Sequence, residues 1–248
     1  MGARDDFPVA MPHGPIEEPF EQIFTVRGTA RFAPLLSITR NMVVLRNLGE
    51  LTIIGAVRLS ADGERALDRL GTVRHLVKLG HFHGMDDPYY VKKYSPVVWA
   101  AKDAVHKPGV TTDELLASGA SLPVPRSELF VFERSTKPEA CLLLKRDDGI
   151  LVTCDSLQNW GDFGGCSLLG RLMMRAMGFG GAARIGPGWR KAFEPKDDKG
   201  FAPDFERLLT LSFRHLLPAH GYPLKDDAKQ AVTARVAEAY RTSRRASR

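Results

Sequence analysis

The chain has 248 residues, 35 Lys and Arg against 29 Asp and Glu, a formal net charge of +6 and a hydrophobic fraction of 44%. These values are typical of a globular protein with one sizeable core or two small ones. The 23 Gly and 16 Pro exclude a coiled coil or a long helical bundle, and the 26% of charged residues excludes wholesale disorder. We expect a compact protein that mixes helices and strands.

Membrane and secretory signals are missing from the sequence. No stretch approaches the roughly 18 to 20 apolar residues of a membrane span, and the N-terminal residues lack the apolar segment of a signal peptide. The cysteines, Cys141, Cys154 and Cys166, are odd in number and show no Cys-x-x-Cys spacing. We therefore expect reduced thiols in a cytoplasmic protein that does not enter a membrane.

The excess positive charge gathers at the C-terminal end, at Arg241, Arg244, Arg245 and Arg248. Cations near a helix C-terminus suit the helix dipole, and no aromatic residues for base stacking lie between them. This pattern favours a solvated helix end over a nucleic-acid-binding surface.

The first half of the chain predicts an arm followed by a sheet. Residues 1–22 contain several prolines and predict an extended N-terminal arm, ahead of a single domain over residues 23–248. The predicted elements are a hairpin of residues 41–46 and 51–57, a helix over 63–70, a strand over 73–79, a short helix over 89–94 and a strand over 97–100.

The second half repeats this rhythm. It predicts strands over 129–133, 140–145 and 150–154, a helix over 167–177, a Gly-rich connector over 178–200, and helices over 205–216 and 224–244. Strand pairs followed by helices, twice over, predict two stacked sheets with helices outside.

Polar residues that suit chemistry follow the predicted strands. If the strand before them continues, His81 and His83 point to the same side, because strand side chains alternate, and two neutral imidazoles can then share a cation. Asp155 ends the apolar strand ILVTC, where an unpaired carboxylate costs several kcal/mol. His220 lies in a sharp Gly-containing loop.

Plainer interpretations stay open for each of these residues. Histidines close together in a loop are more often surface or hydrogen-bonded residues than ligands. Asp155 can cap the turn that follows it, and His220 can simply hold its loop. Their common placement after strands or before helices favours a shared site.

The order of the segments resembles the metallo-β-lactamase-like superfamily. The resemblance rests on Asn41–Ala100 with the segment HFHGMDDPYY, then ILVTCDSL, then LLPAHGYPL, and it covers residues 23–223. It implies an α+β fold, a four-layer αββα sandwich with a metal site at one edge between the sheets. His81 and His83 match the family's opening histidine pair, Asp155 its bridging carboxylate and His220 its last histidine.

The chain departs from the family pattern at two places. Met85 stands where the family has an aspartate, and Asp86 stands where it has a second-metal histidine. No histidine lies between His106 and His215, so the family's middle histidine, expected near residues 133–138, is missing. Arg134 and Lys137 in that segment would repel a cation. These departures argue against a standard dinuclear zinc site.

The remaining residues predict a mononuclear metal-dependent hydrolase that uses a metal-bound water on an unknown small-molecule substrate. His81, His83 and Asp155 would hold one divalent ion, zinc first, with iron or manganese as alternatives, and His220 or Asp86 would complete the set. Asp86 would also orient or deprotonate the water.

Two aromatic residues near the predicted site, Trp160 and Tyr89, are candidates for substrate binding. The alternative to an enzyme is a non-catalytic binding or scaffolding protein of the same fold, with a degenerate site that holds no metal and a basic terminal helix that contacts an acidic partner.

Overall fold

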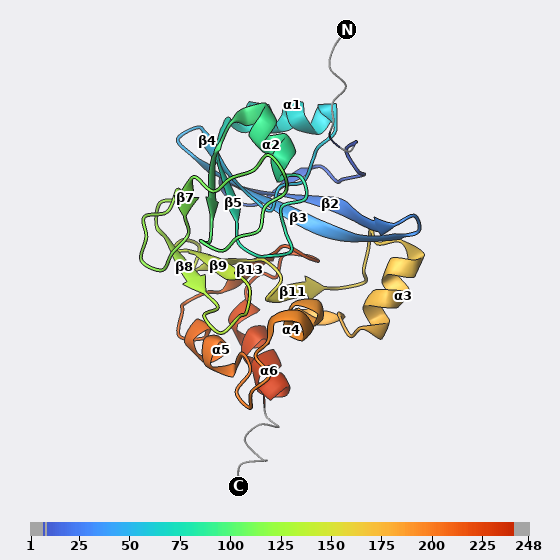
Figure 1. Cartoon of the computed structure of the whole chain (residues 1–248), viewed down its shortest axis with the longest axis vertical. Coiled ribbons are helices and arrows are strands. Elements are labelled where there is room, and N and C mark those ends of the chain that lie inside the picture. Colours follow the sequence, from blue (N-terminus) through green and yellow to red (C-terminus); the bar gives the residue numbers. More distant parts are fainter. Residues whose placement is uncertain (1–6, 8, 241–248) are drawn as a thin grey trace.

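The computed structural model describes residue 7 and residues 9–240. Two sheets lie face to face in it (Figure 1). The first sheet has the strand order β1-β2-β3-β4-β5-β6-β7, antiparallel from β1 to β4 and parallel from β4 to β7. Its strands are β1 (Ile16–Phe20), β2 (Ile23–Ala33), β3 (Leu36–Asn47), β4 (Glu50–Ile54), β5 (Thr72–Lys78), β6 (Val97–Ala100) and β7 (Glu114–Leu115).

The second sheet has the order β13-β10-β9-β8, and a separate two-stranded ribbon joins β11 to β12. Strands β8, β9 and β10 are antiparallel to one another, whereas β13 runs parallel to β10. These strands are β8 (Ser127–Val131), β9 (Ala140–Leu144), β10 (Ile150–Thr153), β11 (Leu157–Trp160), β12 (Gly181–Ile185) and β13 (His215–Pro218).

Helices cover the outer faces of both sheets (Figure 1). Helices α1 and α2 lie on the first sheet, α4, α5 and α6 lie on the second, and α3 lies beside the hairpin of β2 and β3. The arrangement is the αββα sandwich that the sequence predicts. The helices are α1 (Ala61–Leu70), α2 (Asp87–Tyr94), α3 (Leu168–Ala176), α4 (Pro187–Phe193), α5 (Ala202–Leu208) and α6 (Ala228–Tyr240).

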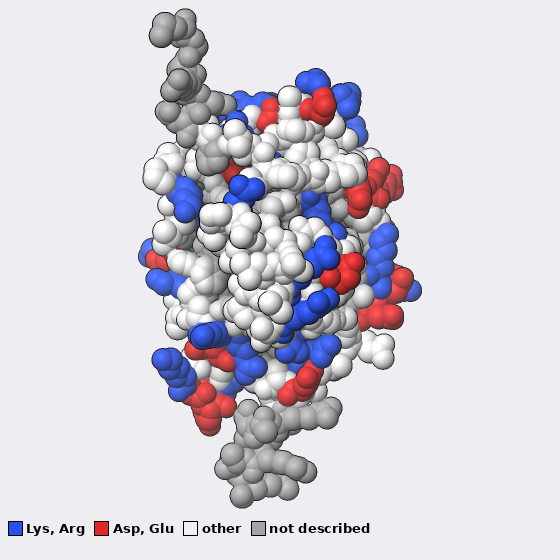
Figure 2. All heavy atoms as spheres, turned by 90° about the vertical axis from the view of Figure 1, so that its right-hand side faces the viewer, with Lys and Arg blue, Asp and Glu red and all other residues white. Residues whose placement is uncertain are grey.

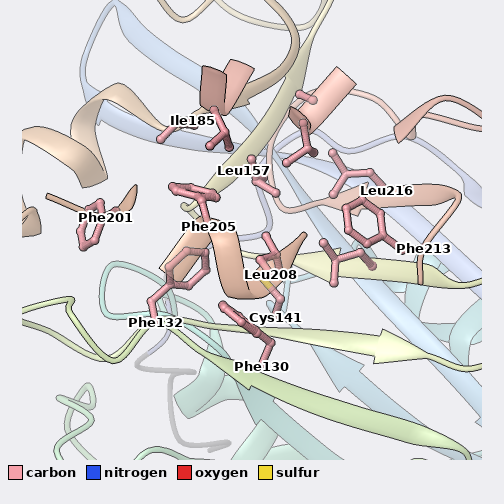
Figure 3. Packing of buried hydrophobic residues seen from close by; sticks show 14 of the residues in the cluster. Phe130, Phe132, Cys141, Leu157, Ile185, Phe201, Phe205, Leu208, Phe213 and Leu216 are labelled. Atoms are coloured by element: carbon pink, nitrogen blue, oxygen red, sulfur yellow. The ribbon is translucent and has the colours of Figure 1, made fainter. Parts of the chain in front are cut away.

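The layers are held together by three main apolar clusters. Val43 and Val77 of the first sheet pack with Leu142 and Val152 of the second, so this cluster lies between the sheets. A second cluster joins the first sheet to α1 and α2. The third packs the second sheet against α4, α5 and α6 and is rich in aromatic rings (Figure 3). Burial of these apolar surfaces is the main stabilising term of such a sandwich.

Local signals set several element ends as the sequence predicts. The hairpin of β3 and β4 turns at Leu48 and Gly49, both with positive φ. The Ser60 hydroxyl accepts a hydrogen bond from Gly63 N and begins α1, and Ser167 does the same for Gly170 N at the start of α3. The last residues of the expected N-terminal arm are extended and pair with β2 as strand β1.

Two sequence predictions of secondary structure are wrong. The helix predicted over residues 205–216 ends at Leu208, and His215–Pro218 forms β13 instead, because these apolar residues pair with β10 in the sheet. The connector predicted over residues 178–200 contains β12 and α4. In both segments tertiary packing overrides the local pattern.

Among the described residues, none of the helices combines the length and the apolar composition of a membrane span. The arginines of the C-terminal end, residues 241–248, lie outside the described residues.

Truncation of Leu142, which is 3% exposed between the two sheets, tests this packing. We expect Leu142→Ala to lower the free energy of unfolding by about 2–5 kcal/mol, because the sheets cannot close fully on the cavity it leaves. Leu48→Ala, at a side chain that is 97% exposed, is the control and should change stability by less than about 0.5 kcal/mol. Urea unfolding measures both, and equal stability of the two variants would contradict the packing.

Candidate functional site

Two neighbouring parallel strands bring Asp155 and His220 to one edge of the second sheet. Thr153, the last residue of β10, is paired with Pro218, the last residue of β13. Asp155 and His220 each follow two residues later, so the parallel register places them side by side. The carboxyl ends of parallel strands are a common place for sites because loops diverge there.

His83 reaches the same point from the first sheet. Its Nε2 lies 3.4 Å from Asp155 Oδ2 and 3.2 Å from His220 Nε2. The Nε2 of His220 lies 3.3 Å from the other carboxylate oxygen, Oδ1. All three side chains are about nine-tenths buried. The structure thus brings together three of the residues that the sequence singles out, His83, Asp155 and His220, and we call this group the His–Asp–His cluster.

The first sheet fixes the orientation of His220. Its Nδ1 donates a hydrogen bond to the carbonyl oxygen of Thr39 at 2.9 Å, so in the neutral ring Nε2 carries the lone pair that faces the cluster. The side chain of Asn41 donates to the carbonyl oxygens of Pro218 and Gly221 at 2.8 and 2.9 Å. Gly221 has a φ of +88°, a conformation that favours glycine, and closes the loop against β11.

Asp155 is a buried anion. Burial by itself raises the pKa of this carboxyl group, but the charge of His83 and the hydrogen bonds of His220 and His83 outweigh burial and hold the pKa below its ordinary value. A negative charge is therefore kept out of water at neutral pH. Such a charge needs a partner cation, either a protonated imidazole or a metal ion.

A hydrogen bond from Lys78 anchors the loop that carries His83. The ammonium group of Lys78, at the end of β5, donates to the carbonyl oxygen of His83 and faces Asp87 at the start of α2. Burial lowers the pKa of Lys78 and raises the pKa of Asp87 to about 6. The hydrogen bond of Lys78 ties the end of β5 to the loop that carries His83.

His81 occupies a different environment from His83. The expected continuation of the strand through both histidines is wrong, because β5 ends at Lys78 and His81 lies in a turn. The alternation of side chains is lost there. The His81 ring packs edge-on against Phe82 and Phe193, and its Nδ1 is buried without a hydrogen-bond partner among the described residues.

Asp86 is engaged by the first sheet. Its Oδ2 accepts hydrogen bonds from the guanidinium group of Arg40 on β3 and from the backbone nitrogen of Arg58, the latter at 2.6 Å. Arg40 also donates to the carbonyl oxygen of Ala56 at 3.0 Å. Asp86 thus fixes a buried arginine beside the cluster rather than contacting His83 or Asp155.

Two further residues near the cluster were not anticipated from the sequence as site residues. Glu139, at the start of β9, is 1% exposed, and its Oε1 accepts a hydrogen bond from Ser156 N at 2.6 Å. Cys154 Sγ lies within 4.8 Å of ligand atoms of His83 and Asp155. Burial, followed by the nearby negative charge, raises the pKa of both groups well above the ordinary values, which keeps them neutral.

Gly80 makes room for these two side chains. A Cβ atom at this position would collide with Glu139 Oε2 and Cys154 Sγ. Glu139 stands directly after the segment where the family's middle histidine is expected. Within that segment Arg134 turns away from the cluster, donating from Nε to the carbonyl oxygen of Gly200 at 2.6 Å and pairing with Asp197.

The sequence around Arg40 and Glu139 contains a signal that could have identified them as residues near the site. Thr39, Arg40 and Asn41 are polar residues within the buried middle part of β3, and Glu139 directly precedes the fully buried strand β9. Buried polar residues in strands are costly unless they are hydrogen-bonded, so such residues mark positions with structural or chemical roles.

All three residues of the cluster line a cavity of about 330 Å³. This volume is in the range of small-molecule sites. Trp160 lines the cavity, stacks on His220 at 5.8 Å between ring centroids, and donates from Nε1 to Gln158 Oε1 at 2.7 Å. Tyr89 is not among the lining residues; its ring lies under the guanidinium of Arg58 at 4.1 Å. The remaining wall is mostly apolar and includes Ala30, Phe32, Ile38, Phe82, Met85, Met174 and Phe179.

Comparisons with known proteins show which solved structures share this fold. No protein-family model matches the sequence, and no curated protein matches it either. Solved structures of metallo-β-lactamases match nearly the whole chain. The metallo-β-lactamase FIM-1 from Pseudomonas aeruginosa, in its mono-zinc form, has 10% sequence identity and a TM-score of 0.62, with 94% of this chain and 98% of that chain covered.

Two other matches agree with this result. DIM-1 metallo-β-lactamase has 14% identity and a TM-score of 0.61, with 93% of this chain and 100% of that chain covered. A metallo-β-lactamase from Erythrobacter litoralis has 11% identity and a TM-score of 0.58, with 90% and 92% covered. The strand order, the two facing sheets and these similarities together identify the fold of this chain as that of the metallo-β-lactamase-like superfamily.

Proposed function

We propose that the chain is a metal-dependent hydrolase that holds one divalent cation in the His–Asp–His cluster. The observation that carries the proposal is the spacing of the donor atoms. His83 Nε2 lies 3.2 Å from His220 Nε2, and these nitrogens lie 3.4 and 3.3 Å from the Oδ2 and Oδ1 atoms of Asp155, respectively. Neighbouring ligands of a tetrahedral zinc ion with bonds of 2.0–2.1 Å are separated by about 3.3 Å.

The chemistry of the donors also fits a cation. The His220 lone pair, the Asp155 carboxylate and His83 Nε2 converge on one point, and lone pairs that face one another repel unless a cation or a proton lies between them. The hydrogen bond from His220 Nδ1 to a backbone carbonyl is the usual support of a metal-binding histidine.

Nitrogen and oxygen donors suit zinc first, with iron and manganese as alternatives. Cys154 is left out of the proposed ligand set because its Sγ lies 3.8 Å from Asp155 Oδ2, farther than the 3.2–3.4 Å contacts within the His–Asp–His cluster. The similarity to a metallo-β-lactamase in a mono-zinc form supports a site for a single ion.

A divalent cation at this position would act as a Lewis acid and lower the pKa of a water molecule that it binds. The protein groups around it have separate tasks. Trp160 and the apolar wall exclude bulk water and hold the uncharged part of a small substrate, while Arg40 offers a positive charge at the cavity wall to a polar or anionic group.

Under this proposal, the other predicted residues have supporting roles. Asp86 orients Arg40 and is not itself a ligand. His81 packs beside the cavity residue Phe82, outside the ligand set. Tyr89 stabilises the contact of α2 with α1 through Glu64 and does not bind substrate.

Metal binding tests the ligand assignment. We expect one equivalent of metal in protein purified without added metal, as measured by elemental analysis. His220→Ala should lower zinc affinity more than about 100-fold. Loss of a residue that only supports a ligand lowers metal affinity by at most about 100-fold, so a larger effect indicates a direct ligand. Competition with a chelator measures this affinity.

Two histidine variants serve as controls. His75→Gln, at a ring that accepts a hydrogen bond from Trp99, and His81→Gln should keep both the metal content and the affinity of the original protein. Protein without metal, which also binds no added zinc, manganese or iron, would favour the non-catalytic binding protein. Loss of metal in His81→Gln with retention in His220→Ala would show that the ligand set is wrong.

Glu139 supports the cluster by staying neutral, because an ionised carboxylate here would repel Asp155. Its raised pKa means that the folded protein binds this proton more tightly than the unfolded chain. The resulting contribution to stability is present below the unfolded pKa of about 4.3 and is lost as pH rises toward the folded pKa.

Glu139→Gln should therefore gain stability relative to the original protein as pH rises. The free energy of unfolding of both proteins is measured without metal, by urea unfolding from pH about 5 to about 7. The difference in this free energy between the variant and the original protein should grow by about 1.4 kcal/mol per pH unit until the pH reaches the pKa of Glu139 in the folded protein. Glu128→Gln, at a half-exposed carboxylate on β8, is the matched control and should show a constant difference. A constant difference for Glu139→Gln as well would mean that Glu139 is ionised in the folded protein.

A further inference from the structure

Large apolar side chains are exposed together on helix α3 and at the tip of the β2–β3 hairpin. Leu168 is 85% exposed and Leu35 is 77% exposed. We call the group the apolar face, and it consists of Phe32, Leu35, Leu168, Leu169 and Leu172. Single exposed leucines are ordinary, but a contiguous group of this kind marks an interaction surface.

Hydrogen bonds hold the two segments of the apolar face side by side. The hydroxyl of Ser167, which caps α3, donates to the carbonyl oxygen of Leu35 at 2.8 Å and accepts from Ser37 N at 3.1 Å. Leu168 follows Ser167 directly, so it lies next to the hairpin tip. The two segments therefore form one surface with a fixed shape.

The apolar face projects from the molecule. The hairpin tip and α3 form the right-hand margin of the view in Figure 1, beyond the two sheets. Figure 2 looks straight at this side and shows a broad uncharged area at its centre, with charged side chains farther out. A projecting apolar surface can insert into a lipid surface. By contrast, a protein that binds a peptide helix needs an apolar groove to hold it.

The charges within these segments are mostly positive. The tip carries Arg31 and α3 carries Arg171 and Arg175, whereas Asp162 is the only acidic residue in 30–38 and 161–181. Within the part of the chain that the structure describes, no salt bridge joins these arginines to a carboxylate. Two copies meeting face to face would bring like charges together, so the face is complementary to an anionic partner.

We propose that the apolar face docks the protein on an anionic lipid surface, with the leucines and Phe32 among the acyl chains and the arginines at the headgroups. A short amphipathic helix that lies in the interface and draws on both apolar burial and anionic lipid is a known mode of peripheral binding. This contact is separate from the proposed hydrolysis and does not require a metal.

Docking in this way sets the cavity beside the lipid. Phe32 belongs both to the apolar face and to the cavity wall, and Met174, on the buried side of α3, also lines the cavity. The cavity wall and the apolar face therefore share residues of the β2–β3 hairpin and of α3, so docking would bring the cavity close to the lipid surface.

Flotation of the metal-free and metal-loaded protein with vesicles tests the proposal. We expect binding to vesicles of phosphatidylcholine with roughly a third of phosphatidylglycerol, and little binding to phosphatidylcholine alone. The charge variant Arg171→Gln/Arg175→Gln should weaken binding about fivefold per arginine. The apolar variant Leu35→Ser/Leu168→Ser should weaken it more than tenfold.

The matched control is Leu48→Ser/Val105→Ser, which removes two exposed apolar side chains elsewhere, one of them at the opposite end of β3. It should bind vesicles like the original protein, and circular dichroism and metal content should be unchanged in every variant. Equal binding by the control and the apolar variant would overturn the proposal. A dimer of the original protein in sedimentation equilibrium would also overturn the proposal if Leu35→Ser/Leu168→Ser made it dissociate. A second copy of the chain would then cover the apolar face.

Discussion

The structure depends on the compensation of one buried charge, the carboxylate of Asp155. It lies between the imidazoles of His83 and His220, at the edge where both sheets meet. Each neighbouring feature serves this arrangement. The parallel pairing of β10 and β13 places Asp155 beside His220, the carbonyl of Thr39 orients His220, and a neutral Glu139 avoids a second negative charge. An anion so placed is costly without a cation, and the proposed metal ion would supply one.

The sequence allowed correct prediction of the sandwich, and it singled out three residues that the structure brings together, for identifiable reasons. Asp155 stands out because it follows the buried, mostly apolar strand β10, and His220 because it directly precedes Gly221 in a tight loop. The position of His81 could not be predicted, because β5 ends at Lys78 and the turn that follows removes the alternation that would place His81 and His83 on one side. Likewise, the contact of Asp86 with Arg40 joins residues that lie 46 positions apart, and no local pattern encodes it.

The arrangement also brings two kinds of side chain together around one cavity. Its wall combines polar groups, namely the His–Asp–His cluster, Arg40 and Gln158, with apolar side chains that include Met174 of α3. The same hairpin, β2–β3, contributes to both, since its buried residues Thr39 and Asn41 hold the loop of His220 and its tip carries exposed Phe32 and Leu35. A movement of this hairpin would therefore change the positions of side chains both at the His–Asp–His cluster and on the apolar face.

X-ray absorption spectroscopy of protein loaded with one equivalent of zinc tests the central claim most directly, because it reports the atoms that surround the ion. The account predicts scattering from two imidazole rings and from oxygen at about 2.0–2.1 Å, with no sulfur near 2.3 Å. A sulfur ligand, which Cys154 would supply, or a single imidazole would contradict the assignment of His83, Asp155 and His220 as the ligands.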